Sequence, residues 1–111
     1  MSDPGPENEV RVVFVTAPDE SVADRLARDL VEGRLAACVN VVPGIRSFYR
    51  WEGAVQADAE FLLVVKTRTD RLEALASRVR EIHPYDLPEI LALPAAGGSR
   101  EYLDWILTES S

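Results

Sequence analysis

Residues 45–67 read IRSFYRWEGAVQADAEFLLVVKT, and they set the architecture of the chain. Both halves of this segment are rich in β-branched and aromatic residues, and Glu-Gly at 52–53 separates them as a tight turn. The preceding residues 36–42 have a strand-like composition, and Pro-Gly at 43–44 predicts a bulge or bend in one continuous strand. The sequence therefore predicts a long β-hairpin whose second strand spans residues 55–67.

A strand and a helix precede this hairpin. Residues 10–15 are β-branched or aromatic apart from one arginine, which is typical of a buried strand. Residues 16–19, Thr-Ala-Pro-Asp, resemble a helix start in which Thr16 opens a capping box. Apolar residues then recur every four positions, and we expect the helix to stop at Gly33.

A second helix, a short strand and a third helix follow the hairpin. Residues 69–70 are expected to open the second helix, with Glu73 completing a capping box and Pro84 ending the helix. The apolar run 90–93 predicts a fourth strand. A terminal helix is expected over residues 99–107, with its first residue, a serine, as the cap.

The order β-α-β-β-α-β predicts a ferredoxin-like α+β fold. In this split β-α-β arrangement two helices cover one face of an antiparallel sheet, and here a short C-terminal helix is added. The length suits one domain, which we place at residues 10–108. The acidic, Pro- and Gly-containing residues 1–9 are expected to be a disordered tail, and residues 109–111 a short second tail.

The face of the predicted sheet that the two helices do not cover is also expected to be buried. An antiparallel sheet usually shows polar alternation on a face that meets water. Residues 12–15, 61–65 and 90–93 are instead apolar at consecutive positions, so both faces require burial. Self-association can supply the missing layer. Tyr49 and Trp51 are the expected anchors of the contact between subunits, because Tyr and Trp are enriched in such contacts.

Charge and motif content argue against several functions. The formal net charge is −7, which opposes binding to nucleic-acid phosphates and to anionic membrane surfaces. The aromatic residues of the hairpin suit RNA recognition, but the acidic charge and the lack of an RNP-like run count against it. There is no apolar run of the ~20 residues that span a membrane and no signal-peptide pattern. With a single cysteine, the chain is expected to be cytoplasmic.

Few residues are candidates for catalysis or for binding a metal ion. Cys38, the single cysteine, lies in a strand-like run and is interpreted as a buried, inert thiol rather than a ligand or nucleophile. His83, the single histidine, is either a cap that faces the dipole of the second helix or a ligand beside Tyr85, Asp86 and Glu89. Because no nucleotide-binding glycine motif and no marked nucleophile–base pair is present, we expect no enzyme and no required cofactor.

Several ordered motifs resemble the CutA family of divalent-cation tolerance proteins. They are VTAP at 15–18, LAACVN at 35–40, YRWEG at 49–53, KT at 66–67, HPY at 83–85, PE at 88–89 and YLDW at 102–105. The resemblance covers about residues 12–105. It implies a ferredoxin-like protomer, a homotrimer built through the long hairpins, an architecture similar to that of PII-type signalling proteins, and association with copper and other divalent cations.

Carried over by position, Cys38 and His83 match the family's usual cysteine and histidine. Val15 and Ile82 stand where some metal-binding members carry a further cysteine and a further histidine. The resemblance therefore implies copper binding that is weak and centred on His83, with Cys38 a doubtful ligand.

Two alternative functions stay open. The first is a PII-like sensor that binds a small molecule or an anion in clefts between subunits. The expected cleft residues are Lys66, Arg68, His83, Tyr85, Asp86 and Glu89. The second is a purely scaffolding trimer. Binding of a metal ion, an anion or neither distinguishes the three functions.

Overall fold

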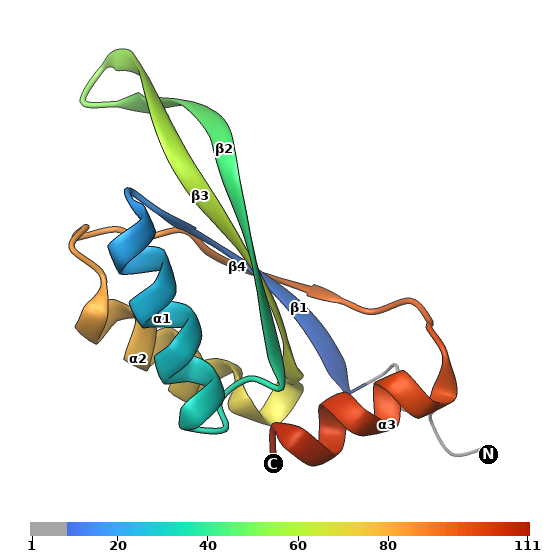
Figure 1. Ribbon diagram of the computed structural model, residues 1–111. Coiled ribbons are helices and arrows are strands. Elements are labelled where there is room, and N and C mark those ends of the chain that lie inside the picture. The colour runs from blue at the N-terminus through green and yellow to red at the C-terminus, as the bar shows by residue number, and fades with distance from the viewer. Residues whose placement is uncertain (1–8) are drawn as a thin grey trace.

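The computed structural model describes residues 9–111 and has the expected element order (Figure 1). The elements are β1 (Val10–Ala17), α1 (Glu20–Glu32), β2 (Cys38–Trp51), β3 (Ala54–Arg68), the short 3-10 helix η2 (Thr69–Arg71), α2 (Leu72–Ile82), β4 (Ile90–Pro94) and α3 (Arg100–Glu109). The strands form one antiparallel sheet in the order β2-β3-β1-β4. This confirms the ferredoxin-like α+β fold. None of the helices described in residues 9–111 is long and apolar enough to cross a membrane.

One face of the sheet is covered by α1 and α2 (Figure 1). Val13 and Val15 of β1 pair with Val65 and Leu63 of β3, and all four side chains are fully buried. The helices contribute buried side chains to the same core, namely Ala23, Leu26, Leu30, Leu75 and Val79. These helix positions recur at three- and four-residue spacing, so the sequence periodicity reports the buried faces directly.

The hairpin of β2 and β3 is the longest feature of the molecule. Its register shifts between Val42 and Ile45, which places the expected bulge at Pro-Gly 43–44. Glu52 and Gly53 both have positive φ angles, 49° and 80°, as a type I′ turn requires. Because β1 pairs with β3 only from residue 61 onward, residues 45–60 pair only with each other. We call residues 45–60 the hairpin arm, and Figure 1 shows it projecting from the body.

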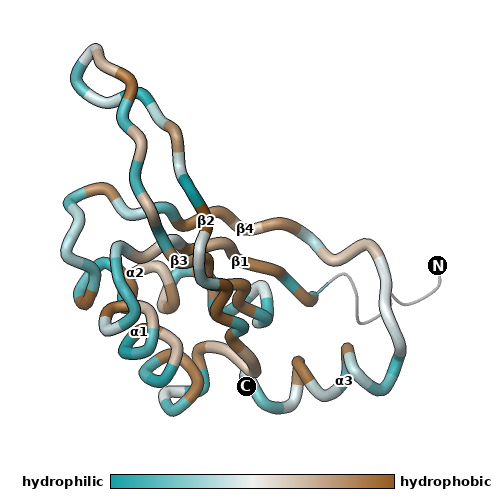
Figure 2. The backbone as a smooth tube through the Cα atoms, turned by 45° about the horizontal axis from the view of Figure 1, so that its top comes forward, coloured by the Kyte–Doolittle hydropathy of each residue, from teal (hydrophilic) through white to brown (hydrophobic). Residues whose placement is uncertain are grey.

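The sheet face opposite α1 and α2 is apolar and largely uncovered. Phe14 lies between Val64 of β3 and Leu91 of β4 in the register of the sheet. Phe14 and Val64 are half-buried, whereas Leu91 and Leu93 are 56% and 39% exposed. Figure 2 shows hydrophobic positions following one another along the central strands. We call this surface the open sheet face, and its composition is as expected from the sequence.

The side-chain caps expected for the first two helices are wrong. Thr16 does not cap α1, because β1 continues through Ala17 and pairs with β3 there. Asp19 is the cap instead, and its side chain accepts a hydrogen bond of 2.9 Å from the Val22 N–H. No capping box opens α2 either: Thr69 begins a 3-10 turn that has no side-chain cap. Ser99 caps α3 as expected.

The two chain ends differ from expectation in different ways. Most of the tail expected at 1–9 lies outside the described residues, and the carbonyl of Glu9 accepts a hydrogen bond from the Thr69 N–H. The tail expected at 109–111 is instead part of the fold, because α3 runs to Glu109 and Ser110 is fully buried. Side chains of three arginines donate to the last carbonyls, Arg68 to Leu107, Arg71 to Ser110 and Arg34 to Thr108 and Ser111.

Candidate functional site

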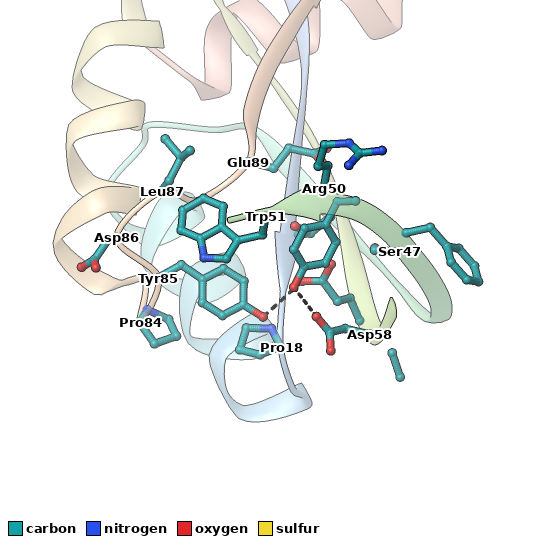
Figure 3. Close-up of a pocket in the computed structure, with 15 residues that line it drawn as sticks. Pro18, Ser47, Arg50, Trp51, Asp58, Pro84, Tyr85, Asp86, Leu87 and Glu89 are labelled. Carbon is teal, nitrogen blue, oxygen red and sulfur yellow. Dashed lines mark hydrogen bonds between the residues drawn. The ribbon is translucent and has the colours of Figure 1, made fainter. Parts of the chain in front are cut away.

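An open groove of about 970 Å³ lies between the hairpin arm and the segment that follows α2 (Figure 3). We call it the hairpin groove. Its lining consists of residues 47–51 and 58–60 of the arm, residues 84–87 and Glu89 of the loop, and Thr16 and Pro18 at the end of β1. Three segments that are distant in the sequence therefore meet at one place.

Strand alternation decides which arm side chains face the groove. Successive side chains of a strand point to opposite sides. Tyr49 and Trp51 share one side of β2, and Asp58, which pairs with Ser47, shares that side from β3. The hydroxyl of Tyr49 donates a hydrogen bond to Asp58. Arg50 belongs to the opposite side, and Figure 3 shows its guanidinium extending away from Tyr85 and Asp58.

His83 holds the loop of the groove against β1. Its backbone N–H caps α2 by donating to the Val79 carbonyl over 2.8 Å. The side chain is buried, with Nδ1 accepting from the Tyr85 N–H over 3.1 Å and Nε2 lying 2.7 Å from the Thr16 carbonyl. Because Nδ1 accepts, the ring proton is assigned to Nε2, which donates to Thr16. His83 is thus the cap of α2, as one interpretation of the sequence expected, and within one chain its ring has no nitrogen free for a metal ion.

The hairpin groove is acidic. Its lining has four carboxylate residues, Asp58, Glu60, Asp86 and Glu89, and one arginine. Glu60 is only 6% exposed, and its carboxylate accepts a long hydrogen bond of 3.4 Å from the Tyr85 hydroxyl. Within residues 9–111 no ion pair includes any of the four carboxylates. The groove therefore favours a positively charged occupant.

Burial and negative charge shift the acidities of several groove residues. Burial, and then the charge of Glu60, raise the pKa of Glu89. Burial, followed by the charges of Glu60 and Asp58, raises the pKa of Tyr85. The hydrogen bond to Asp58 raises the pKa of Tyr49 to about 12. Both tyrosines are therefore neutral hydrogen-bond donors at physiological pH.

Lys66 and Arg68 are not in this groove within one chain. They pair with Val12 and Val10, whereas Thr16 of the groove pairs with Leu62. The four residues from Leu62 to Lys66 span about 13 Å of strand. Of the expected cleft residues, the structure brings together His83, Tyr85, Asp86 and Glu89.

Lys66 and Arg68 each form polar contacts at their own end of the sheet. Lys66, the single lysine of the chain, donates to the side chain of Asn40. Arg68 forms an ion pair with Asp70 at 3.0 Å and donates to the Leu107 carbonyl. These contacts hold the Arg68 side chain against the C-terminal end of α3.

Cys38 lies at the same end of the sheet and is half-buried rather than buried as expected. It is the first residue of β2, and its Sγ lies 3.9 Å from the side-chain oxygen of Asn40. Burial, and then the neighbouring Cys38, raise the pKa of Tyr102. Among the described residues, no group of three or more His, Cys, Asp and Glu side chains is arranged to hold a metal ion.

Sequence reasoning missed Asp58 and Glu60 as groove residues. The signal that could have found Asp58 is the hairpin register. Counting outward from the turn at 52–53 pairs residue 51 with 54 and residue 47 with 58. That register places Asp58 one step diagonally from Tyr49, close enough for the hydrogen bond that is observed.

Comparison with known proteins gives one consistent family. The family model of the CutA1 divalent ion tolerance protein matches residues 11–109. The divalent-cation tolerance protein CutA of Thermus thermophilus is 58% identical over 95 residues, 86% of this chain and 92% of that protein. Protein CutA of Homo sapiens is 47% identical over 103 residues, 91% of this chain and 58% of that protein. A solved structure of the divalent cation tolerance protein (Cut A1) from Thermus thermophilus has a TM-score of 0.90 and 54% identity, covering 92% of this chain and 99% of that chain.

Proposed function

Because the chain belongs to the CutA1 divalent ion tolerance family, we propose that it acts in tolerance of divalent cations as a homotrimer. It does so by binding and not by catalysis. We place it in the cytoplasm, where its single free cysteine would stay reduced.

The open sheet face supports self-association and is the observation that carries the proposal. Leu91 is 56% exposed and Val42 is 41% exposed, beside half-buried Phe14, Leu62 and Val64. Contiguous apolar surface of this kind on a folded domain marks an interaction site. Apart from the end that α3 covers, the described residues leave this face without a second layer, and another copy of the chain carries a surface of matching character.

The hairpin arm supports a closed ring. An isolated two-stranded ribbon is marginally stable in water. This arm nevertheless carries exposed aromatic side chains, Phe48 at 67%, Trp51 at 47% and Tyr49 at 41%. The arm and the open sheet face are different surfaces, so an arm that packs on a neighbour's face makes a head-to-tail contact. Such contacts close into cyclic assemblies when the rotation permits.

The metal chemistry that we propose is weak binding of a divalent cation such as Cu²⁺. Within one chain both nitrogens of His83 are engaged, and Cys38 lies at the other end of the sheet. Carboxylates remain, and Asp86 and Glu89 of the groove are the available oxygen ligands. A complete coordination sphere would require ligands from more than one subunit.

A second candidate function is a PII-like sensor with a ligand site in the hairpin groove. The groove volume of about 970 Å³ lies at the upper end of the range for small-molecule sites, about 300–1,000 Å³. Its aromatic walls also suit such a site. The expected anion does not suit it, since carboxylates outnumber basic side chains in the lining.

Light scattering combined with calorimetry tests the proposal. The expected mass in solution is three times the 12.3 kDa of one chain. Titration with CuCl₂ should give binding that is micromolar or weaker. A mass of one chain at micromolar concentration would contradict the trimer, and absence of any Cu²⁺ binding by the trimer would contradict the metal role.

A further inference from the structure

One side of β3 carries opposite charges at its two ends. Successive side chains of a strand point to opposite sides, so residues 58, 60, 62, 64, 66 and 68 share a side. In order they are Asp, Glu, Leu, Val, Lys and Arg. Leu63 and Val65, which point the other way, are fully buried in the core under α1 and α2. The six residues therefore form a stripe along the open sheet face that is acidic at one end, apolar in the middle and basic at the other. We call it the β3 stripe.

Glu60, near the acidic end of the β3 stripe, lacks an opposite charge within one chain. Its side chain is 6% exposed and accepts a long hydrogen bond of 3.4 Å from the Tyr85 hydroxyl. That donor is neutral, and no ion pair found in residues 9–111 includes Glu60. A buried carboxylate has lost hydration, and a neutral donor replaces only part of that loss.

Lys66, near the basic end, has the complementary deficit. It is half-buried on the open sheet face and donates to the neutral side chain of Asn40. The part of the chain that the structure describes gives it no ion pair, whereas Arg68 already has Asp70. If another copy covers this face, the ammonium loses the water around it and then requires an anion.

The two charges cannot balance each other within one chain. Six residues of β3 separate Glu60 from Lys66, a distance of about 20 Å along the strand. Glu60 is the last residue of the hairpin arm, whereas Lys66 belongs to the open sheet face. A head-to-tail contact, in which the arm of one copy packs on the open sheet face of the next, brings these two surfaces together.

We propose that Glu60 of each copy forms an ion pair with Lys66 of the next copy around the ring. Each contact between subunits then contains one such pair, and Leu62 and Val64 of the β3 stripe supply apolar contact beside it. Because like ends of the stripe repel one another, the pair also sets the direction in which copies join. This inference rests on the homotrimer proposed above and names residues that hold it together.

A free anion between the copies is the alternative partner for Lys66. It would balance the ammonium but leave Glu60 buried without a cation. The ion pair between copies balances both charges at once, and the variants below distinguish the two arrangements.

Charge reversal tests the pair by light scattering over a dilution series. Lys66→Glu places two carboxylates in every contact, and Glu60→Lys places two ammonium groups there. Each change should raise the concentration at which half of the chains are assembled at least tenfold. The double variant Lys66→Glu/Glu60→Lys restores opposite charges in every contact and should return this concentration to within a few-fold of the wild type.

Arg100→Glu is the matched control. It makes the same change of net charge as Lys66→Glu, at a side chain that is 76% exposed on α3. Its assembly should equal that of the wild type. An equal effect of Arg100→Glu and Lys66→Glu would show that general charge repulsion, and not this pair, weakens the assembly.

Neutral variants keep the test decisive if circular dichroism shows that Glu60→Lys does not fold. Lys66→Met or Glu60→Gln alone leaves one charge buried without its partner and should weaken the assembly. The double variant Lys66→Met/Glu60→Gln leaves neither charge, so it should dissociate no more readily than the weaker single variant. Additive losses would show that the two residues do not meet.

The remaining outcomes separate this inference from the trimer itself. If the wild type is a single chain, the trimer and the inference both fail. If the wild type is a trimer that either reversal leaves intact, the inference alone fails. If both reversals dissociate the trimer and the double variant does not reassemble, Lys66 has another anion as its partner and the inference is wrong.

Discussion

The Nε2 atom of His83 lies 2.7 Å from the carbonyl oxygen of Thr16, across 67 residues of sequence. This contact joins the end of β1 to the loop that carries Tyr85, Asp86 and Glu89. The other ring nitrogen, Nδ1, accepts a hydrogen bond from the Tyr85 N–H. One side chain therefore holds both the end of β1 and this loop in place. His83 is therefore a positioning residue for the hairpin groove.

His83→Ala should destabilise the fold more than it alters Cu²⁺ binding. The change removes two hydrogen bonds of a buried side chain and leaves the Tyr85 N–H without its acceptor, a loss of about 2 kcal/mol or more. Urea denaturation measures the stability and calorimetry the affinity for Cu²⁺. Glu101→Ala, an exposed change on α3, is the control. Complete loss of Cu²⁺ binding with unchanged stability would instead identify His83 as a ligand.

Asp29→Asn should destabilise the chain at neutral pH but not in acid. Arg78 holds Asp29 by two hydrogen bonds of 2.7 Å and so joins α1 to α2. These bonds lower the pKa of Asp29 below its ordinary 3.8. The unfolded chain then takes up the proton first, so the stabilisation is present above about pH 4 and is lost as the pH falls through the lowered pKa.

Melting temperatures against pH check this expectation. The curve of Asp29→Asn should lie a few degrees below that of the wild type at pH 7, and the two should converge as the pH falls through the lowered pKa of Asp29. Asp24→Asn, an exposed change on the same helix, should follow the wild type throughout. A constant difference between the curves at all pH values would show that the ion pair is not its cause.

Much of the fold was predictable because its signals are local. The turn at 52–53 and the apolar runs beside it define the hairpin, and the four-residue periodicity defines α1. Thr16 was assigned to a helix cap because its capping pattern is also local, whereas its pairing with Leu62 depends on a distant strand. Burial of Ser110 could not be predicted either, since it depends on arginines that the fold brings to α3.

The candidate site was predictable only in part. His83, Tyr85, Asp86 and Glu89 are close in sequence, so their proximity needed no knowledge of the fold. Lys66 and Arg68 lie apart from them within one chain, and their place in a cleft between subunits stays a prediction. The eleven residues of α2 carry the chain about 16 Å back along the sheet before the loop begins. Counting from the turn also pairs Glu60 with Ile45, but the burial of Glu60 beside Tyr85 depends on a loop that only the fold brings there.

Trp51→Ala should weaken the trimer while leaving each chain folded. Trp51 is 47% exposed on the hairpin arm, so its truncation removes little packing within one chain. Aromatic anchors at an interface typically contribute about 2 kcal/mol or more. Light scattering over a dilution series measures the dissociation. Trp105→Ala is the matched control, with 43% exposure on α3, and an equal effect of both changes would contradict an anchoring role of the arm.

Leu91→Glu should convert the assembly into single chains. Leu91 is 56% exposed on the open sheet face, and a carboxylate there cannot be buried against a neighbour without a large desolvation cost. The expected mass is then the 12.3 kDa of one chain, with the circular dichroism of a folded domain. Val31→Glu places the same charge on α1, at a residue 40% exposed, and should leave the trimer intact. A trimeric Leu91→Glu variant would show that this face is not the interface.

The tyrosines of the folded chain should ionise at unusually high pH, and Asp58→Asn should lower the pKa of one of them. The three tyrosines are Tyr49, Tyr85 and Tyr102, and each has a raised pKa, that of Tyr49 reaching about 12. The asparagine keeps the size of the side chain but removes the charge that the Tyr49 hydroxyl donates to.

Absorbance at alkaline pH measures this titration directly. One third of the tyrosinate signal should move from near pH 12 toward the ordinary value near 10 in Asp58→Asn. The unfolded chain loses its tyrosine protons first, so in the wild type the contribution of the tyrosines to stability should be fully present below pH 10 and fall as the pH rises from 10 to 12. Asp104→Asn, an exposed change on α3, should leave the titration of Tyr49 unaltered. If the wild type releases all three protons near pH 10, Tyr49 does not donate to Asp58 in solution, and the arrangement of this wall of the hairpin groove is wrong.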